Sequence, residues 1–294
     1  SIVSGTIAER IKLVPFLIFA IFLTGIIYPI QGSWTWGGGW LSEMGFSDFA
    51  GSTIVHSVGG WAALTGALII GPRIGKYGPN GQVNAIPGSN LPLATIGTFI
   101  LWFGWFGFNG GSQLALGSAA DAAAIANVYV NTNMAACAGL VAALILSILL
   151  YKKTDLTFVL NGALAGLVAI TAGPDVATPL QAMIIGAIGG ILTTLAIPLL
   201  DKIGIDDVVG AISVHLVSGI WGTLAVAIPG LNGSGDIGTQ IIGIVSIGLF
   251  TVILSGIGWF ALKAIYGLRP SEEEENIVLN FSELGMDAYP EFKN

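Results

Sequence analysis

Charged residues, cysteine and histidine are all scarce in this chain of 294 residues. Charged side chains make up 9% of it, whereas about a quarter of an ordinary soluble domain is charged, and the mean hydropathy is +0.84. The single cysteine, Cys137, excludes an intrachain disulfide and a cysteine-based metal site. This composition indicates an integral membrane protein surrounded by a lipid bilayer, and it gives no sign of nucleic-acid binding. We expect no metal and no cofactor.

The apolar residues form long continuous runs, which predict an all-α bundle of transmembrane helices. A spanning helix needs about 20 apolar residues, whereas a membrane β-strand would alternate in polarity over about ten. The segment 1–10 resembles the end of a further helix and has no initiating Met, so we expect the chain to begin within a protein of this kind. The complete windows lie at about 11–31, 51–71, 92–112, 125–151, 156–172, 178–200, 207–229 and 238–267.

The positively charged residues predict the orientation of the bundle. With these windows, all of them fall on one side of the membrane: Arg10, Lys12, Arg73, Lys76, Lys152, Lys153, Lys202, Lys263, Arg269 and Lys293. The loops on the other side, 31–50, 113–124, 172–177 and 230–237, contain no Lys or Arg. By the positive-inside rule the C-terminus is cytoplasmic. We therefore expect a multi-pass protein of the plasma (inner) membrane.

Connections between the windows are short, which predicts one membrane domain over residues 1–269 and a cytoplasmic tail over 270–294. The formal charge of -7 comes partly from an acidic run in this tail, Glu272 to Glu275. Blocks of like charge are commonly disordered. We interpret the run as a solvated linker.

The only two histidines lie inside apolar windows and share a sequence context. The pattern is Asp48-x7-His56-x3-Gly60 in one window and Asp207-x7-His215-x3-Gly219 in the other. The second window is the fifth after the first, so the two helices cross the membrane in opposite directions. This predicts inverted repeats with a shared site between them, an arrangement typical of transporters.

Several kinds of chemistry could use such a histidine pair. A metal centre needs three or four ligands, and nucleophilic catalysis needs a Ser or Cys beside an oriented base. The windows supply neither pattern, so we do not expect an enzyme. Intramembrane polar residues also serve as helix contacts, which leaves packing of both histidines as an alternative. We favour two neutral imidazoles that line a narrow apolar pore, because each ring has one donor and one acceptor nitrogen.

Several motifs along the chain resemble those of the ammonium transporter (Amt/Mep/Rh) family. They are Trp34-Thr-Trp36-Gly-Gly-Gly-Trp40, Asp48-Phe-Ala-Gly-Ser-Thr53-Ile-Val-His56, Trp105-Phe-Gly-Phe108-Asn-Gly-Gly-Ser112, Gly162-Ala-Leu-Ala-Gly166, Ser213-Val-His215 and Gly267-Leu-Arg-Pro-Ser. The resemblance covers essentially the whole chain. It implies a family fold of eleven helices with inverted five-helix repeats, assembled as a homotrimer. About eight helices and a part of another are present, which fits that fold from its third helix onward.

The resemblance also implies roles for individual residues. Trp36 and Ser112 match an outer vestibule where ammonium is recruited, although a tryptophan there is also typical of an interfacial belt. Phe108 matches the inner of two pore-blocking phenylalanines, and the outer one would lie before Ser1. The pore lining would comprise His56, His215, Phe108, Trp105 and Thr171, with Asp48 and Thr53 as structural residues near the site.

The function implied by the resemblance is transport of ammonium. Ammonium would bind at the outer vestibule, give up a proton and cross as ammonia between the histidines. A neutral ammonia channel and an ammonium sensor that uses the same binding site are the alternatives. The tail from Ile277 to Tyr289 resembles the family's regulatory C-terminus, which makes a PII-type regulatory protein a hypothetical partner.

Overall fold

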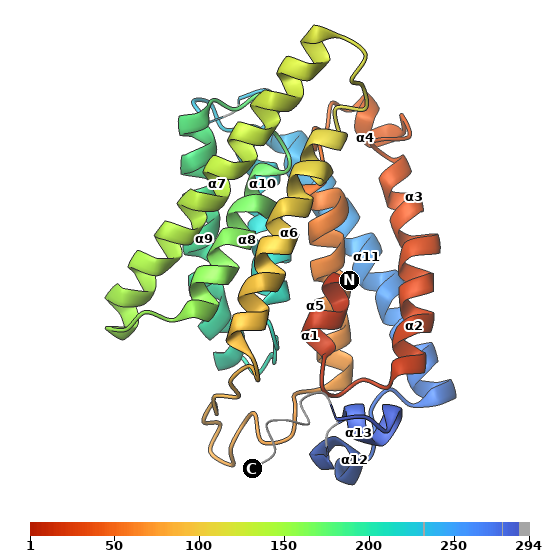
Figure 1. Ribbon diagram of the computed structural model, residues 1–294. Helices are drawn as coiled ribbons and strands as arrows, with labels where there is room; N and C mark the ends of the chain where they lie inside the picture. The colour runs from red at the N-terminus through yellow and green to blue at the C-terminus, as the bar shows by residue number, and fades with distance from the viewer. Residues whose placement is uncertain (232, 278, 288–294) are drawn as a thin grey trace.

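Helices account for almost all regular structure in the molecule (Figure 1). The computed structural model describes residues 1–231, 233–277 and 279–287. Within these ranges, extended pairing is limited to an isolated bridge between Tyr77 and Val83. The elements are α1 (Ile2–Ile7), α2 (Leu13–Phe22), η1 (Leu23–Ile27), α3 (Tyr28–Ser33), α4 (Trp40–Glu43), η2 (Ser52–Ser57), α5 (Val58–Ile70), α6 (Leu91–Gly111), α7 (Ala119–Tyr151), α8 (Leu156–Ile170), α9 (Pro179–Lys202), η3 (Ile212–Val217), α10 (Ser218–Ala225), α11 (Ile237–Tyr266), α12 (Glu272–Ile277) and α13 (Leu279–Leu284), where η marks a π-helix.

The predicted transmembrane bundle is confirmed. Among the described residues, six helical stretches are long and apolar enough to cross a membrane: Leu13–Ser33, Ser52–Ile70, Leu91–Gly111, Ala119–Tyr151, Pro179–Lys202 and Ile237–Tyr266. Two shorter apolar helices, Leu156–Ile170 and Ile212–Ala225, match the other two predicted windows. The main difference is at 207–210, where the predicted helix has not yet begun. Gly210 there has a φ of 80°, which a right-handed helix does not accommodate.

The acidic run in the tail forms a helix, which corrects its interpretation as a solvated linker. Glu272–Ile277 make up α12. Both carboxylate oxygens of Glu275 accept hydrogen bonds from the Arg269 guanidinium, at 2.6 and 2.7 Å. The backbone N–H of Ile74 also donates to Glu275, at 3.1 Å. These partners hold the run against the bundle. Residues 278 and 288–294 of the predicted tail lie outside the described residues.

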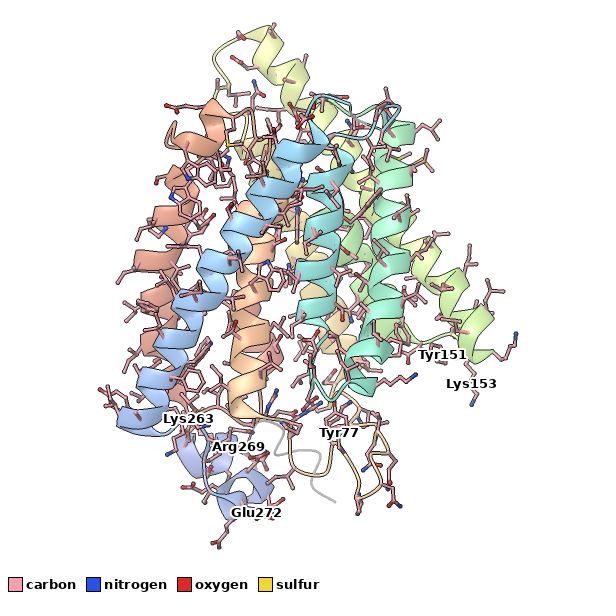
Figure 2. The ribbon with its side chains drawn as sticks, turned by 180° about the vertical axis from the view of Figure 1, so that it is seen from behind. Tyr77, Tyr151, Lys153, Lys263, Arg269 and Glu272 are labelled. Atoms are coloured by element: carbon pink, nitrogen blue, oxygen red, sulfur yellow. The ribbon has the colours of Figure 1, made fainter. Side chains whose placement is uncertain are left out.

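Basic side chains gather at the end of the bundle that carries the tail. Figure 2 shows Lys153, Lys263 and Arg269 at this end. A buried ion cluster lies here as well: Arg73 donates from Nε and Nη2 to the carboxylate of Asp206, at 2.9 and 3.0 Å. Burial raises the pKa of Asp206, but the hydrogen bonds from Arg73 outweigh it and hold this pKa below its ordinary value. The cluster joins the loop after α5 to the loop before η3.

The two histidine-bearing helices run in opposite directions, as predicted (Figure 1). The stretch η2–α5 descends toward the tail, and η3–α10 ascends from it. The glycine that ends each sequence pattern allows the helices to approach closely. A Cβ on Gly60 would lie 2.6 Å from the Cβ of Leu216 in η3, and a Cβ on Gly219 would collide with the backbone oxygen of Ser52 in η2. Each glycine therefore packs against the other repeat.

Candidate functional site

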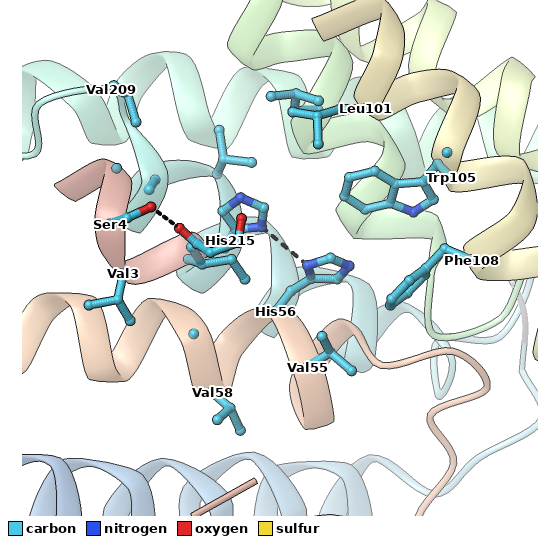
Figure 3. Close-up of a pocket in the computed structure, with 18 of the residues that line it drawn as sticks. Val3, Ser4, Val55, His56, Val58, Leu101, Trp105, Phe108, Val209 and His215 are labelled. Carbon is cyan, nitrogen blue, oxygen red and sulfur yellow. Dashed lines mark hydrogen bonds between the residues drawn. The ribbon is translucent and has the colours of Figure 1, made fainter. Parts of the chain in front are cut away.

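An apolar cavity of about 650 Å³ lies between the two repeats, and both histidines line it (Figure 3). Most of its wall is aliphatic or aromatic. Its polar side chains besides the histidines are those of Ser1, Ser4, Thr24, Tyr28 and Asn161, and among its apolar residues are Leu23, Val55, Leu101, Trp105, Phe108, Val209 and Val214. Besides the nitrogens of the two imidazole rings, the wall therefore offers few polar atoms to a molecule inside the cavity.

The imidazoles of His56 and His215 contact each other directly. Their Nδ1 atoms are 3.2 Å apart, which is hydrogen-bonding distance, and the ring centroids are 5.2 Å apart with the planes inclined by 21°. Two neutral rings can share this bond only if one donates and the other accepts. The donor ring then has a bare Nε2, and the acceptor ring carries its proton on Nε2. The Nε2 of His56 is buried and has no hydrogen-bond partner, so it is available to a small molecule.

Both histidines are presented from π-helical turns. A π-helix contains an extra residue per turn and commonly marks a functional site. Within the described residues there are three π-helices, and each contributes to the cavity lining: Leu23 and Thr24 from η1, Val55 and His56 from η2, and Val214 and His215 from η3. The sequence did not predict these turns.

An aspartate fixes the beginning of each histidine-bearing helix. The Asp48 carboxylate accepts hydrogen bonds from the N–H groups of Gly51, Ser52, Thr53 and Ile54, at 2.8 to 3.0 Å. It lies three residues before the N-cap residue Gly51. Burial raises the pKa of Asp48 to about 6, although these four bonds act in the opposite direction. Asp48 is thus a capping residue, and it is not among the residues that line the cavity.

Asp207 plays the matching part in the second repeat. One of its oxygens accepts the N–H groups of Ile212 and Ser213, at 2.9 and 3.1 Å, and the other accepts the hydroxyl of Thr6, at 2.8 Å. Burial raises the pKa of this carboxyl also to about 6. The sequence pattern therefore corresponds to a repeated local structure: a capping Asp, a π-helical His and a Gly at the crossing.

An aromatic wall covers one side of His56. Trp105 stacks on the imidazole, with centroids 4.8 Å apart and planes inclined by 17°. Phe108 lies 5.4 Å from the same ring. Trp105 is 7% exposed and Phe108 is 38% exposed. Figure 3 shows both rings beside His56, on the side away from His215. Phe108 is thus the more accessible ring.

Thr171 lies behind this wall and is not among the residues that line the cavity. Its hydroxyl oxygen accepts the indole N–H of Trp105 at 3.0 Å. The carboxamide of Asn109 is close to the same hydroxyl, at 3.3 Å, and donates to Thr132 at 2.9 Å. Sequence reasoning missed Asn109, although it directly follows Phe108 in a quoted motif. Helical spacing gave no signal that it faces inward.

The residues expected at the outer vestibule lie at the opposite end from the tail. Trp36 is 47% exposed and its indole N–H donates to the backbone oxygen of Asp48 at 3.0 Å. Ser112 follows α6 directly, and its hydroxyl donates to the backbone oxygen of Phe108 at 2.9 Å. Thr53 is buried, with its hydroxyl 2.6 Å from that of Thr223. Trp36 therefore presents a ring face to solvent next to the Asp48 cap.

Comparison with known proteins assigns a family to this arrangement. A sequence model described as Ammonium Transporter Family matches residues 1–289. The chain belongs to the ammonium transporter family. This membership accounts for the motifs along the whole chain, and the family and its curated relatives are named as ammonium transporters, not as enzymes.

Relatives of this ammonium transporter family member extend over greater lengths. Ammonium transporter Amt2 of Archaeoglobus fulgidus is 43% identical over 99% of this chain and 68% of its own. A putative ammonium transporter of Synechocystis is 41% identical over 96% of this chain, which covers 55% of that relative. The solved structure of a sensor Amt protein has a TM-score of 0.90 at 43% identity, over 96% of this chain and 73% of that one. The chain thus spans about half to three quarters of the lengths that it matches.

Proposed function

We propose that the chain conducts ammonium or ammonia across the membrane through the cavity that holds the histidine pair. The observation that carries this proposal is the Nδ1 to Nδ1 contact of His56 and His215 inside an apolar wall, in a member of the ammonium transporter family. Ammonium is recruited at Trp36 and Ser112, where an exposed indole face attracts a small cation. On entering the apolar pore it gives up its proton, either to water at the vestibule or to the imidazole pair, and ammonia passes Phe108 and the two imidazoles.

Loss of the proton is the step that provides selectivity. An intact charge at the centre of a bilayer costs at least about 2.5 kcal/mol, and an alkali ion has no proton to release. Neutral ammonia carries both a lone pair and N–H donors. It therefore matches a pair of imidazoles that presents a bare Nε2 and a protonated Nε2. Conduction of ammonia alone and conduction with a separate proton along the imidazoles are the two forms of this proposal.

Replacement of the histidines tests the role of the pair. We expect His56→Ala and His215→Ala each to alter the current that ammonium evokes, or the exclusion of potassium, in proteoliposomes. The control is Cys137→Ser, because Cys137 is an exposed side chain on α7. Electrogenic, potassium-excluding uptake that is unchanged in both variants would remove the proposed role. Ammonia flux without any current in the unaltered protein would favour the neutral channel.

A sensor is the second candidate function, and the similarity to a solved sensor Amt protein favours considering it. A sensor would use the same binding site and signal through the tail. Ammonium binding measured by calorimetry, together with neither current nor flux in proteoliposomes, would select the sensor.

The setting of the protein forms part of the same proposal. Residues 1–269 form the membrane domain of a homotrimer in the plasma (inner) membrane, and residues 270–294 are a cytoplasmic tail, in keeping with the basic residues at that end (Figure 2). The mass of the protein in detergent tests the trimer. Docking of a PII-type regulator is tested by titration against protein without the tail, and equal affinities would count against a role of the tail in docking.

A further inference from the structure

The orientation of the Trp105 ring depends on one hydrogen bond to a residue outside the cavity. The indole is almost fully buried and stacks on His56. Its polar atom, Nε1, donates to Thr171 Oγ1 at 3.0 Å. An indole nitrogen is a donor only, so Thr171 must accept this bond. The single hydroxyl proton of Thr171 is then shared between the backbone oxygen of Leu167, at 2.7 Å, and Asn109 Oδ1, at 3.3 Å.

The surroundings of Thr171 hold its hydroxyl in this geometry. Asn109 Oδ1 lies 3.3 Å from the hydroxyl, and Asn109 Nδ2 donates to Thr132 in α7. The backbone oxygen of Thr171 accepts the N–H of Ala50 at 3.0 Å. Ala50 lies between the Asp48 cap and the first residue of η2. The side chains of Thr171, Asn109 and Thr132 are fully buried. Water would therefore not readily replace a hydrogen-bond partner that one of them loses.

We propose that Thr171 and Asn109 are positioning residues that hold the Trp105 indole parallel to the His56 ring. The inference rests on the proposed function, because it concerns the wall of the same pore. The hydroxyl fixes the tilt of the indole, and the indole in turn keeps one face of the imidazole covered. Without the hydroxyl the ring can rotate about its bond to Cβ. The cavity then widens beside His56 and admits larger or hydrated cations.

Two substitutions at position 171 distinguish the effect of the hydroxyl group from the effect of the shape of the side chain. Thr171→Val keeps the branched shape and removes the acceptor, whereas Thr171→Ser keeps the acceptor. We expect Thr171→Val to lower the preference for ammonium over potassium by about fivefold, the effect of one hydrogen bond, and Thr171→Ser to retain it. A merely structural role would lower the thermal midpoint and leave this preference unchanged.

A spectroscopic measurement reports on the ring itself. The chain has eight tryptophans, so 5-fluorotryptophan labelling gives separate fluorine signals, and Trp105→Phe identifies the one from Trp105. We expect Thr171→Val to shift that signal and Thr171→Ser to leave it nearly in place. A signal that is unmoved in Thr171→Val would overturn the proposal. This test applies even if the unaltered protein carries no ammonium, in which case the proposed function alone fails.

A double substitution completes the test. In Trp105→Phe, which lacks the donor, we expect Thr171→Val to cause no further loss of selectivity. Full additivity of the two losses would show that Thr171 does not act through Trp105, and would overturn the proposal. If Thr171→Val does not fold, Asn109→Leu provides the second variant. We expect it to shift the Trp105 fluorine signal in the same direction, and an unmoved signal would overturn the proposal.

Discussion

His56 and His215 follow the same sequence pattern, yet they face different surroundings. His56 lies against Trp105 and Phe108, whereas the aromatic contact of His215 within the described residues is with His56. Asp48 caps its helix with four backbone bonds and Asp207 caps its own with two. Only the second pattern is preceded by an ion-paired acid, Asp206, which Arg73 holds.

The different surroundings of His56 and His215 show which features come from the repeated sequence pattern and which come from the residues around it. The Asp, His and Gly of each pattern fix a backbone arrangement: a capped start, a wide turn and a close crossing. The surroundings then make the pair directional, with an aromatic wall toward the end that bears Trp36 and an ion cluster toward the end that bears the tail. A symmetric backbone thus has two different surroundings, which suits the proposed transport, in which ammonium loses its proton on one side and ammonia regains one on the other.

The two glycines should show the largest effects, because both repeats depend on them equally. We expect Gly60→Ala and Gly219→Ala each to destabilise the protein by about 1–3 kcal/mol or more, since the added methyl group overlaps the facing repeat. Gly97→Ala in α6 is the control, because no atom lies within 4 Å of a Cβ there, and it should be neutral or stabilising by up to about 1 kcal/mol. Thermal unfolding in detergent measures the losses. Wild-type stability in either crossing variant would contradict the reciprocal packing.

The capping aspartates should give unequal effects of intermediate size. In Asp48→Asn, one carboxamide oxygen must serve donors that now use two oxygens, and the loss should be about 2–4 kcal/mol. In Asp207→Asn, the oxygen can still accept from Ile212 and Ser213, while the new NH₂ group donates to the Thr6 hydroxyl. That loss should be about 1 kcal/mol. The free energy of unfolding of the two variants decides the matter, and equal losses would show that the caps are equivalent.

The parts of the fold that depend on long apolar runs were predictable from the sequence. Runs such as Leu13 to Ile30 can only be satisfied by a spanning helix, and the count of windows between His56 and His215 gives their opposite directions. The π-turns were not predictable, because one extra residue per turn leaves no periodic trace in a run of apolar residues. The order of α12 also depends on a distant partner, since Glu275 is held by Arg269 and Ile74.

The sequence predicted which residues form the candidate site better than it predicted how they are arranged. The motifs brought out Trp105, Phe108 and both histidines, and the structure brings these four rings together. Thr171 was expected in the pore lining and lies behind Trp105. Thr171 is the C-cap residue of α8 and keeps helical dihedral angles, φ -59° and ψ -25°, but its hydroxyl meets the Trp105 indole, which comes from α6. Contacts of this kind require the neighbouring helix to be known.

The smallest effect should come from the end of the first repeat that the tail contacts. Arg269 donates to the backbone oxygen of Ile70 at the end of α5, at 3.3 Å, and Glu275 holds that guanidinium. For the second repeat, the end of α10 is followed by turns at the far side of the molecule. A partly exposed ion pair contributes about 0–1 kcal/mol, so Glu275→Gln should leave the global stability nearly unchanged and loosen only the tail. Hydrogen exchange at the Ile74 amide measures this loosening.

The pH dependence of that contact has a definite sign. Burial raises the pKa of Glu275, but the bonds from Arg269 and from the Ile74 N–H outweigh it and keep the pKa below the ordinary value. A group with a depressed folded pKa contributes stability above its unfolded pKa and loses that contribution as pH falls through the folded one. Exchange at Ile74 should therefore be slow at neutral pH and accelerate only when the pH falls below the ordinary pKa of a glutamate, after correction for the intrinsic rate. Glu275→Gln should abolish this acceleration, whereas Glu272→Gln, at an exposed position of the same helix, should preserve it. If both variants keep the acceleration, the tail is held by contacts other than Glu275, and the two repeats differ less at their ends than the structure indicates.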